Sequence, residues 1–108
     1  MQVFKSLREA NLARQILWGG ASQGPLYRAT ELGGEVGEAL NVVKKLERER
    51  LGLPGSRSSK EELAAELGDV LICVDLLAAE YGIDAEAAAR HKFNATSAKM
   101  GFPVRVEV

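Results

Sequence analysis

The chain has 108 residues, a length that suits one domain (residues 1–108), and 46% of them are hydrophobic, enough for a packed core. Its net charge of −1 gives no general attraction to a nucleic-acid polymer or an anionic membrane, and no apolar run approaches the ~20 residues of a membrane span. The single cysteine, Cys73, cannot form an internal disulfide, and residues 1–5 do not resemble a signal peptide, so we expect a cytoplasmic protein.

The first predicted helix begins at a capping box. Ser6 supplies a hydroxyl at the N-cap, and Glu9 follows three residues later. The helix should run to about Leu17 and end at the Trp18-Gly19-Gly20 sequence. Residues 19–24 are typical of a loop, and Pro25 suits the first turn of the next helix.

The second predicted helix spans residues 25–50. Its apolar residues recur at intervals of three and four and predict one buried stripe, formed by Leu32, Val36, Ala39, Val43 and Leu46. Residues 51–57 contain glycine and proline and predict a surface loop.

Two further helices follow this loop. Ser59 and Glu62 form a second capping box, and the helix that they open has apolar residues at the helical period until the Tyr81-Gly82 sequence. Asp84 caps a last helix, from 85 to about 99. The tail, about 102–108, alternates like a strand and should be frayed, packed on a helix or paired with a partner chain. We therefore predict an all-α protein with a four-helix bundle.

Two acidic pairs stand out on the second and third helices. Glu35 and Glu38 form the first pair, and Glu66 and Asp69 form the second. An i,i+3 spacing places both side chains of a pair on one helix face, with Cβ atoms about 5–6 Å apart. Each pair flanks the apolar stripe of its helix, so packing of the stripes should bring four carboxylates to the edge of the interface. Oxygen ligands of this kind suit Mg²⁺, or Mn²⁺ in its place.

Four glycines interrupt the two acidic helices. Gly33, Gly34 and Gly37 lie in the second helix and Gly68 in the third, although each costs about 0.5–1 kcal/mol relative to alanine. Such a cost predicts that a neighbouring helix or a ligand approaches the backbone closely there.

With these acidic pairs and glycines, the sequence resembles the MazG-like, all-α nucleoside triphosphate pyrophosphohydrolases. The resemblance covers residues 25–101 and rests on three segments: Glu-Leu-Gly-Gly-Glu-Val-Gly-Glu-Ala at 31–39, Glu-Leu-Gly-Asp-Val-Leu-Ile at 66–72, and Lys-Phe-Asn at 92–94. It implies a helical bundle that works as a homodimer or a dimer of dimers. It also implies Mg²⁺-dependent cleavage of a (d)NTP between the α and β phosphates, to (d)NMP and pyrophosphate, in nucleotide-pool housekeeping.

The resemblance fails at one position. Many members carry a double glutamate at the start of the signature, and here the first of these positions is Gly34. Glu31, one turn earlier on the same face, is our candidate for the base that activates water, and Glu38 is the next.

Cations and aromatic side chains supply the predicted substrate contacts. The phosphates need positive charge beyond the metal, and the base of the nucleotide can stack on an aromatic ring. The candidates for substrate binding are Lys45, Arg57, Lys92, Asn94 and Trp18.

Two other functions stay open at this level. The acidic face of a non-enzymatic helical protein would instead dock a basic partner. Within the family, the chain would also suit an enzyme resembling phosphoribosyl-ATP pyrophosphatase, because the sequence does not select a base or a sugar.

Overall fold

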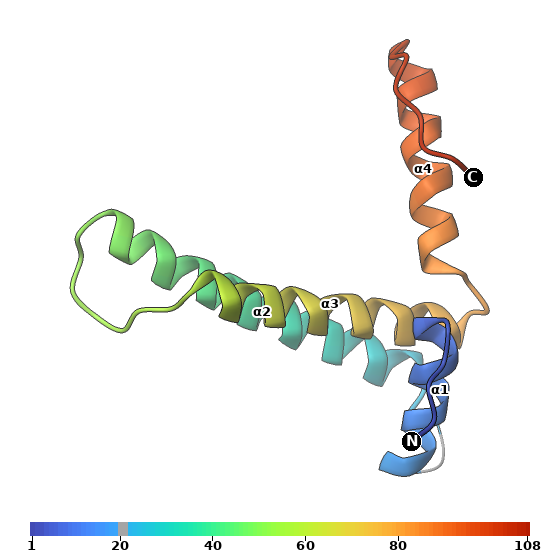
Figure 1. Cartoon of the computed structure of the whole chain (residues 1–108), viewed down its shortest axis with the longest axis horizontal. Coiled ribbons are helices and arrows are strands. Elements are labelled where there is room, and N and C mark those ends of the chain that lie inside the picture. Colours follow the sequence, from blue (N-terminus) through green and yellow to red (C-terminus); the bar gives the residue numbers. More distant parts are fainter. Residues whose placement is uncertain (20–21) are drawn as a thin grey trace.

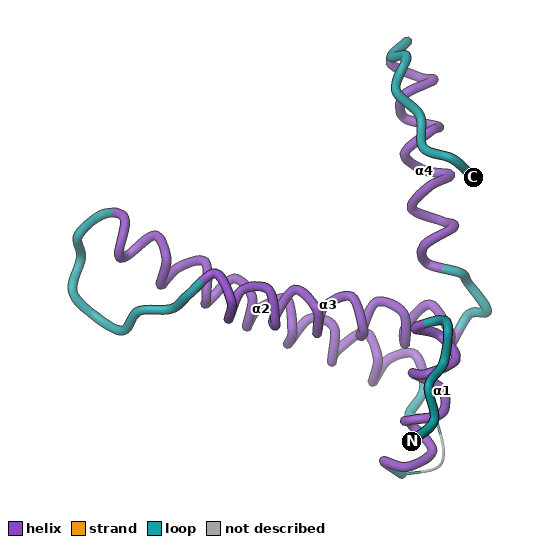
Figure 2. Tube along the Cα trace, in the orientation of Figure 1, coloured by secondary structure: helices purple, strands orange, loops and turns teal. Residues whose placement is uncertain are grey.

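The protein is entirely helical in its described part, residues 1–19 and 22–108 of a computed structural model (Figures 1 and 2). The helices are α1 (Leu7–Trp18), α2 (Pro25–Arg50), α3 (Lys60–Glu80) and α4 (Ala85–Met100), with no strand in these ranges. Every predicted helix is present, with bounds that agree within about a residue. The prediction of an all-α protein is therefore confirmed.

Local capping chemistry explains where the helices begin and end. The side-chain oxygens of Ser6, Ser59 and Asp84 each accept a hydrogen bond from the backbone N–H three residues further on, at 3.1, 3.1 and 3.0 Å. Pro25 opens α2, where its missing N–H costs nothing. Gly101 ends α4 with φ +71°, a conformation that side chains with a Cβ rarely adopt.

The four helices of one chain do not form a bundle. In Figure 1, α2 and α3 form a long antiparallel hairpin, and α1 packs across one end of it. From that same end α4 projects away, and among the helices it contacts α3 alone. The radius of gyration is 17.4 Å, whereas a compact domain of this length has about 13 Å. The predicted four-helix bundle is thus wrong for a single chain, because α4 reaches no common core.

The core is the narrow interface between α2 and α3. We call the buried and half-buried residues at intervals of three and four on the two helices the α2–α3 seam: Arg28, Leu32, Glu35, Ala39 and Val42, with Leu63, Glu66, Val70, Cys73 and Leu76. Val36 and Val43, predicted to be buried, remain 39% and 41% exposed. Because α3 is the main neighbour of α2, the buried apolar stripe of α2 is narrower than the stripe predicted from its sequence.

A large apolar surface therefore stays open. Residues on one side of the hairpin are exposed although apolar, namely Val36, Leu40, Val43, Leu67 and Leu71. The chain exposes 8049 Å², whereas a compact monomer of 11.6 kDa exposes about 5,800 Å². No helix of the described residues has both the length and the apolarity that crossing a bilayer requires.

A polar network fastens α1 to α3. Asp75 receives hydrogen bonds from Arg8 Nε at 3.1 Å and from the Asn11 amide at 2.9 Å. Asn11 is only 2% exposed and also donates to the carbonyl of Ile72. The half-buried Asp75 carboxylate has a cation and an amide as partners, so its charge is compensated within the chain.

The C-terminal tail folds back along α4 (Figure 1). The Asn94 side chain donates to the Val106 carbonyl and accepts from the Val106 N–H, both at 2.8 Å. Arg90 donates to the carbonyl of Glu107 at 2.8 Å. Of the three arrangements expected for the tail, the structure shows packing on a helix, because an asparagine side chain satisfies the backbone groups of the tail.

Candidate active site

Two of the predicted metal ligands lie inside the α2–α3 seam. Glu35 and Glu66 occupy seam positions that continue the apolar series of Ala39 and Cys73, and both are half-buried. Glu38 and Asp69 are exposed beside the seam. The sequence suggested that the acidic pairs only flank the apolar stripes. In the structure each pair also contributes one glutamate to the helix interface itself.

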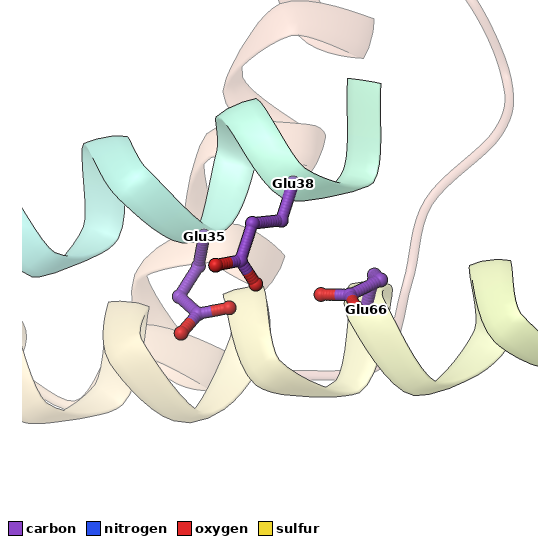
Figure 3. A group of neighbouring side chains, drawn as sticks. All are labelled: Glu35, Glu38 and Glu66. Atoms are coloured by element: carbon purple, nitrogen blue, oxygen red, sulfur yellow. The ribbon is translucent and has the colours of Figure 1, made fainter. Parts of the chain in front are cut away.

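Three carboxylates converge at this point of the hairpin. Oxygen atoms of Glu35, Glu38 and Glu66 all lie within 4.8 Å of one another. Figure 3 shows the side chains of Glu35 and Glu38, from α2, and of Glu66, from α3, pointing toward one another. Within the described part of the chain, none of the three forms an ion pair. We call these three residues the acidic cluster.

The electrostatics of the cluster disfavour ionised carboxylates. Burial raises the pKa of Glu35, and the nearby charges of Glu38 and Asp69 raise it further. Burial, followed by the same two charges, also raises the pKa of Glu66. Like charges at these separations repel unless a cation lies between them.

The cluster has the properties of a site for a divalent cation. The Oε2 atoms of Glu35 and Glu66 are buried and accept no hydrogen bond from any described residue. A buried carboxylate oxygen without a donor is costly, and a hard cation removes that cost. The oxygen-only donor set suits Mg²⁺ or Mn²⁺. Asp69, the fourth predicted ligand, lies outside the group of three but close enough for its charge to act on Glu35 and Glu66.

Glu31, the predicted base, has a different environment. Its Oε1 atom receives a hydrogen bond from Arg28 Nη1 at 3.2 Å. Arg28 is only 4% exposed, and its Nη2 donates to the Gln15 side chain of α1 at 2.6 Å. Glu31 is therefore the one acid of this helix face that has a cation of its own among the described residues.

A cavity of about 320 Å³ adjoins the cluster, between α1, α2 and α3. Glu31, Glu35 and Asp69 line it together with residues of α1 and the start of α2. Its volume falls in the range of small-molecule sites. We call it the α1 cavity.

Aromatic and cationic side chains form the outer wall of the α1 cavity. Trp18 is 70% exposed, and the Arg14 guanidinium lies 4.9 Å from its ring centroid. Tyr27 and Arg28 also line the cavity. Trp18 is thus the one predicted substrate-binding residue that the described structure brings beside the acidic residues.

A thiol also lines the α1 cavity. Burial and the carboxylates of Glu31 and Glu35 raise the pKa of Cys73 to about 11. The thiol is therefore protonated near neutral pH and is a poor nucleophile.

The other predicted substrate contacts lie away from this cavity. Lys45 is two turns beyond Glu38 on α2, and Arg57 belongs to the loop between α2 and α3. Figure 1 shows this loop at the end of the hairpin opposite α1. Lys92 and Asn94 are on α4, and the Asn94 amide binds the tail. Within one chain these four residues do not meet the acidic cluster, and their role in substrate binding stays a prediction.

Open space surrounds the helical glycines. A Cβ atom built at Gly33, Gly34, Gly37 or Gly68 would meet nothing within 4 Å among the described residues. The predicted close approach of a neighbouring helix is therefore wrong within the chain.

Sequence reasoning missed Arg14 and Arg28 as residues of this site. A signal was present in both cases: Arg14 precedes Trp18 by four residues, and Arg28 precedes Glu31 by three, spacings at which helical side chains meet. Pairs with such spacing are common on solvated helices, so the spacing alone does not identify these arginines as residues of a site.

One comparison with known proteins identifies a family. The family model described as "MazG nucleotide pyrophosphohydrolase domain" matches residues 23–100, which include α2, α3, α4 and the acidic cluster. The comparisons with curated proteins and with solved structures give no match.

Proposed function

Because it belongs to the MazG nucleotide pyrophosphohydrolase domain family, we propose that this protein hydrolyses a nucleoside triphosphate to a nucleoside monophosphate and pyrophosphate with the help of Mg²⁺. The observation that supports the proposal most strongly is the acidic cluster, three carboxylates that pair with no cationic side chain of the described residues, beside a cavity whose volume lies in the range of small-molecule sites. We assign the enzyme to nucleotide-pool housekeeping in the cytoplasm.

Glu35, Glu38 and Glu66 would hold the metal, with Asp69 as a fourth ligand. When bound, Mg²⁺ would neutralise the phosphate oxygens and increase the acidity of the attacking water. The packing of α2 on α3 would place these carboxylates together for the metal. The raised pKa values of Glu35 and Glu66 are consistent with such a role, since functional carboxylates often sit where their charges are poorly compensated.

Glu31 accepts the proton of the attacking water. Water adds across the phosphoanhydride bond between the α and β phosphates: its oxygen joins one of these two phosphorus atoms, the bond from that phosphorus to the bridging oxygen breaks, and the products are nucleoside monophosphate and pyrophosphate. The released proton passes to the Glu31 carboxylate, which lines the cavity and is not part of the acidic cluster. Glu38 is the second candidate for this role.

The α1 cavity would receive the nucleoside part of the substrate. Trp18 and Tyr27 offer aromatic faces for the base, and Arg14 places a positive charge on the same wall. The triphosphate would then extend over the acidic cluster. Neither the base nor the sugar is selected by these contacts.

A second copy of the chain would complete the molecule. The exposed surface exceeds that of a compact monomer by roughly 2,200 Å², more than the ~800 Å² that each partner buries in a standard interface. We propose at least a homodimer, in which the exposed apolar side of the hairpin and α4 are covered by the partner, and a dimer of dimers as the larger assembly. Lys92 and Asn94 would then lie near a substrate only through the partner. Light scattering that shows a fully active monomer at micromolar concentration would contradict this arrangement.

The decisive experiment measures released pyrophosphate. A panel of canonical and damaged NTPs and dNTPs, with phosphoribosyl-ATP included, is incubated with the protein and Mg²⁺. We expect Mg²⁺-dependent release from at least one member, and loss of this release in Glu66→Gln. Glu47→Gln, which removes an exposed carboxylate of α2 that pairs with Arg50, is the matched control and should retain activity. If no member releases pyrophosphate, the acidic face is better interpreted as a docking surface for a basic partner.

A further inference from the structure

Arg28 is a buried cation between α1, α2 and the active site. Its side chain is 4% exposed, and it also approaches the Tyr27 ring, at 5.6 Å from the centroid. A buried guanidinium is stable only when its charge and its N–H groups have partners. Gln15 and Glu31 provide them, at 2.6 and 3.2 Å.

These contacts separate Glu31 from the acidic cluster. Glu31 and Glu35 are four residues apart on α2, so their side chains share a helix face. Without a cation of its own, Glu31 would be free to turn toward the divalent ion as a further ligand. The Arg28 guanidinium instead holds one carboxylate oxygen of Glu31 on the α1 side.

We propose that Arg28 is a positioning residue that fixes the Glu31 carboxylate for proton transfer and keeps it out of the metal-binding set. The inference rests on the proposed function for the proton-transfer part, and on charge and geometry alone for the metal-binding part. Arg28 lines the α1 cavity but is 4% exposed, and its role in this scheme is to act through Glu31.

Gln15 extends the same arrangement to α1. Its side chain accepts from the second guanidinium nitrogen of Arg28, which fixes the plane of the guanidinium. Two anchored nitrogens orient Glu31 more strictly than the point charge of a lysine. The position of α1 on α3, held by Asp75, therefore helps to set the geometry of the base.

A double-mutant cycle tests the proton-transfer part. We compare wild type with Arg28→Met, Glu31→Gln and the double variant, using the substrate that releases pyrophosphate. Arg28→Met should lower kcat by roughly 10- to 100-fold, as small misplacements of a catalytic group do, with little change in KM. In the Glu31→Gln background the same change should have no further effect. An unchanged kcat in Arg28→Met, or losses that multiply in the double variant, would overturn the proposal.

Manganese binding tests the metal part without activity. Mn²⁺ affinity is measured by electron paramagnetic resonance on the full chain. Arg28→Met frees the carboxylate and removes a nearby positive charge, so Mn²⁺ should bind at least about threefold more tightly. Adding Glu31→Gln should return the affinity to the wild-type value. An affinity that is unchanged or lower in Arg28→Met contradicts the proposal.

Controls separate this inference from the proposed function and from loss of fold. Arg50→Met removes an arginine from another i,i+3 pair of α2, far from the cavity, and should change neither kcat nor Mn²⁺ affinity. If Arg28→Met does not fold, Gln15→Met loosens the same guanidinium and should give smaller changes with the same signs. If wild type releases no pyrophosphate, the proposed function fails, and the Mn²⁺ measurement still decides whether Arg28 keeps Glu31 out of the metal-binding set.

Discussion

Two carboxylates of α3, Asp75 and Glu66, differ in whether a neighbouring cation compensates their charge. At the α1 interface, Asp75 accepts from both Arg8 and Asn11, so its charge is compensated. At the α2 interface, Glu66 meets Glu35 and Glu38, and no described cation pairs with any of them. Folding alone explains the first group. The second group has no such compensation, and we propose that it holds a divalent cation.

Glu31 combines properties of both groups, and its replacement should give the largest effect. It has a cation, Arg28, yet it lines the α1 cavity. Glu31→Gln should lower kcat about 10²- to 10⁴-fold, the usual contribution of general base catalysis. Metal affinity should change far less than in Glu38→Gln. Near-normal turnover in steady-state assays would move the proton acceptor to another group, and loss of metal would place Glu31 in the metal-binding set.

The next effect concerns metal and the uncompensated cluster. Mg²⁺ or Mn²⁺ at about 100 times Kd should stabilise the native state by about 2.7 kcal/mol, because only the folded chain brings the ligands together. Glu38→Gln should abolish the corresponding rise in Tm while leaving the helical content intact, and Asp69→Asn tests the fourth ligand in the same way. The measurement is thermal unfolding by circular dichroism with and without metal. An undiminished metal response in both variants would refute the assignment.

Removing the Asp75 carboxylate should lower the stability of the fold without changing metal binding. Asp75→Ala leaves Arg8 and the buried Asn11 without their shared acceptor, which should lower the free energy of unfolding by about 2–3 kcal/mol. The gain in Tm upon addition of metal should be retained. Chemical denaturation with and without Mg²⁺ measures both quantities. A lost metal response would show that the two groups are not independent.

The smallest predicted effect is a pH-dependent gain in stability when a glutamate of the acidic cluster is neutralised. Glu35 and Glu66 have folded pKa values above the usual 4.5, so their stabilising protonated forms are fully present below that pH and are lost as the pH rises through the folded pKa values. In metal-free buffer, Glu35→Gln and Glu66→Gln should therefore match wild type at or below about pH 4.5 and melt at higher temperature near neutral pH.

Glu47 provides the control for this pH dependence. Its hydrogen bond with Arg50 lowers its pKa, so its contribution is present above the usual pKa and is lost as the pH falls. Glu47→Gln should thus show the opposite sign near neutral pH. If the melting temperatures of all three variants changed in the same direction near neutral pH, the acidic cluster would not differ electrostatically from an exposed ion pair.

The sequence by itself determined the helices and the residues of the acidic cluster. Ser6, Ser59 and Asp84 define helix starts through contacts within one turn, so no distant residue is needed to predict them. The i,i+3 spacing of Glu35 and Glu38 places both on one helix face for the same reason. Such features depend only on residues close together in the chain.

Only the tertiary structure decided how the carboxylates divide into partnered and unpartnered groups. Glu35 and Glu66 lie in the α2–α3 seam, Glu31 pairs with Arg28, and Asp75 pairs with Arg8. The sequence alone does not show which of these acids has a cationic partner. The tertiary structure also decided that α4 leaves the hairpin and that Asn94 binds the tail. The physical reason is that burial and charge compensation depend on which helices pack together, and that packing joins residues up to 75 positions apart.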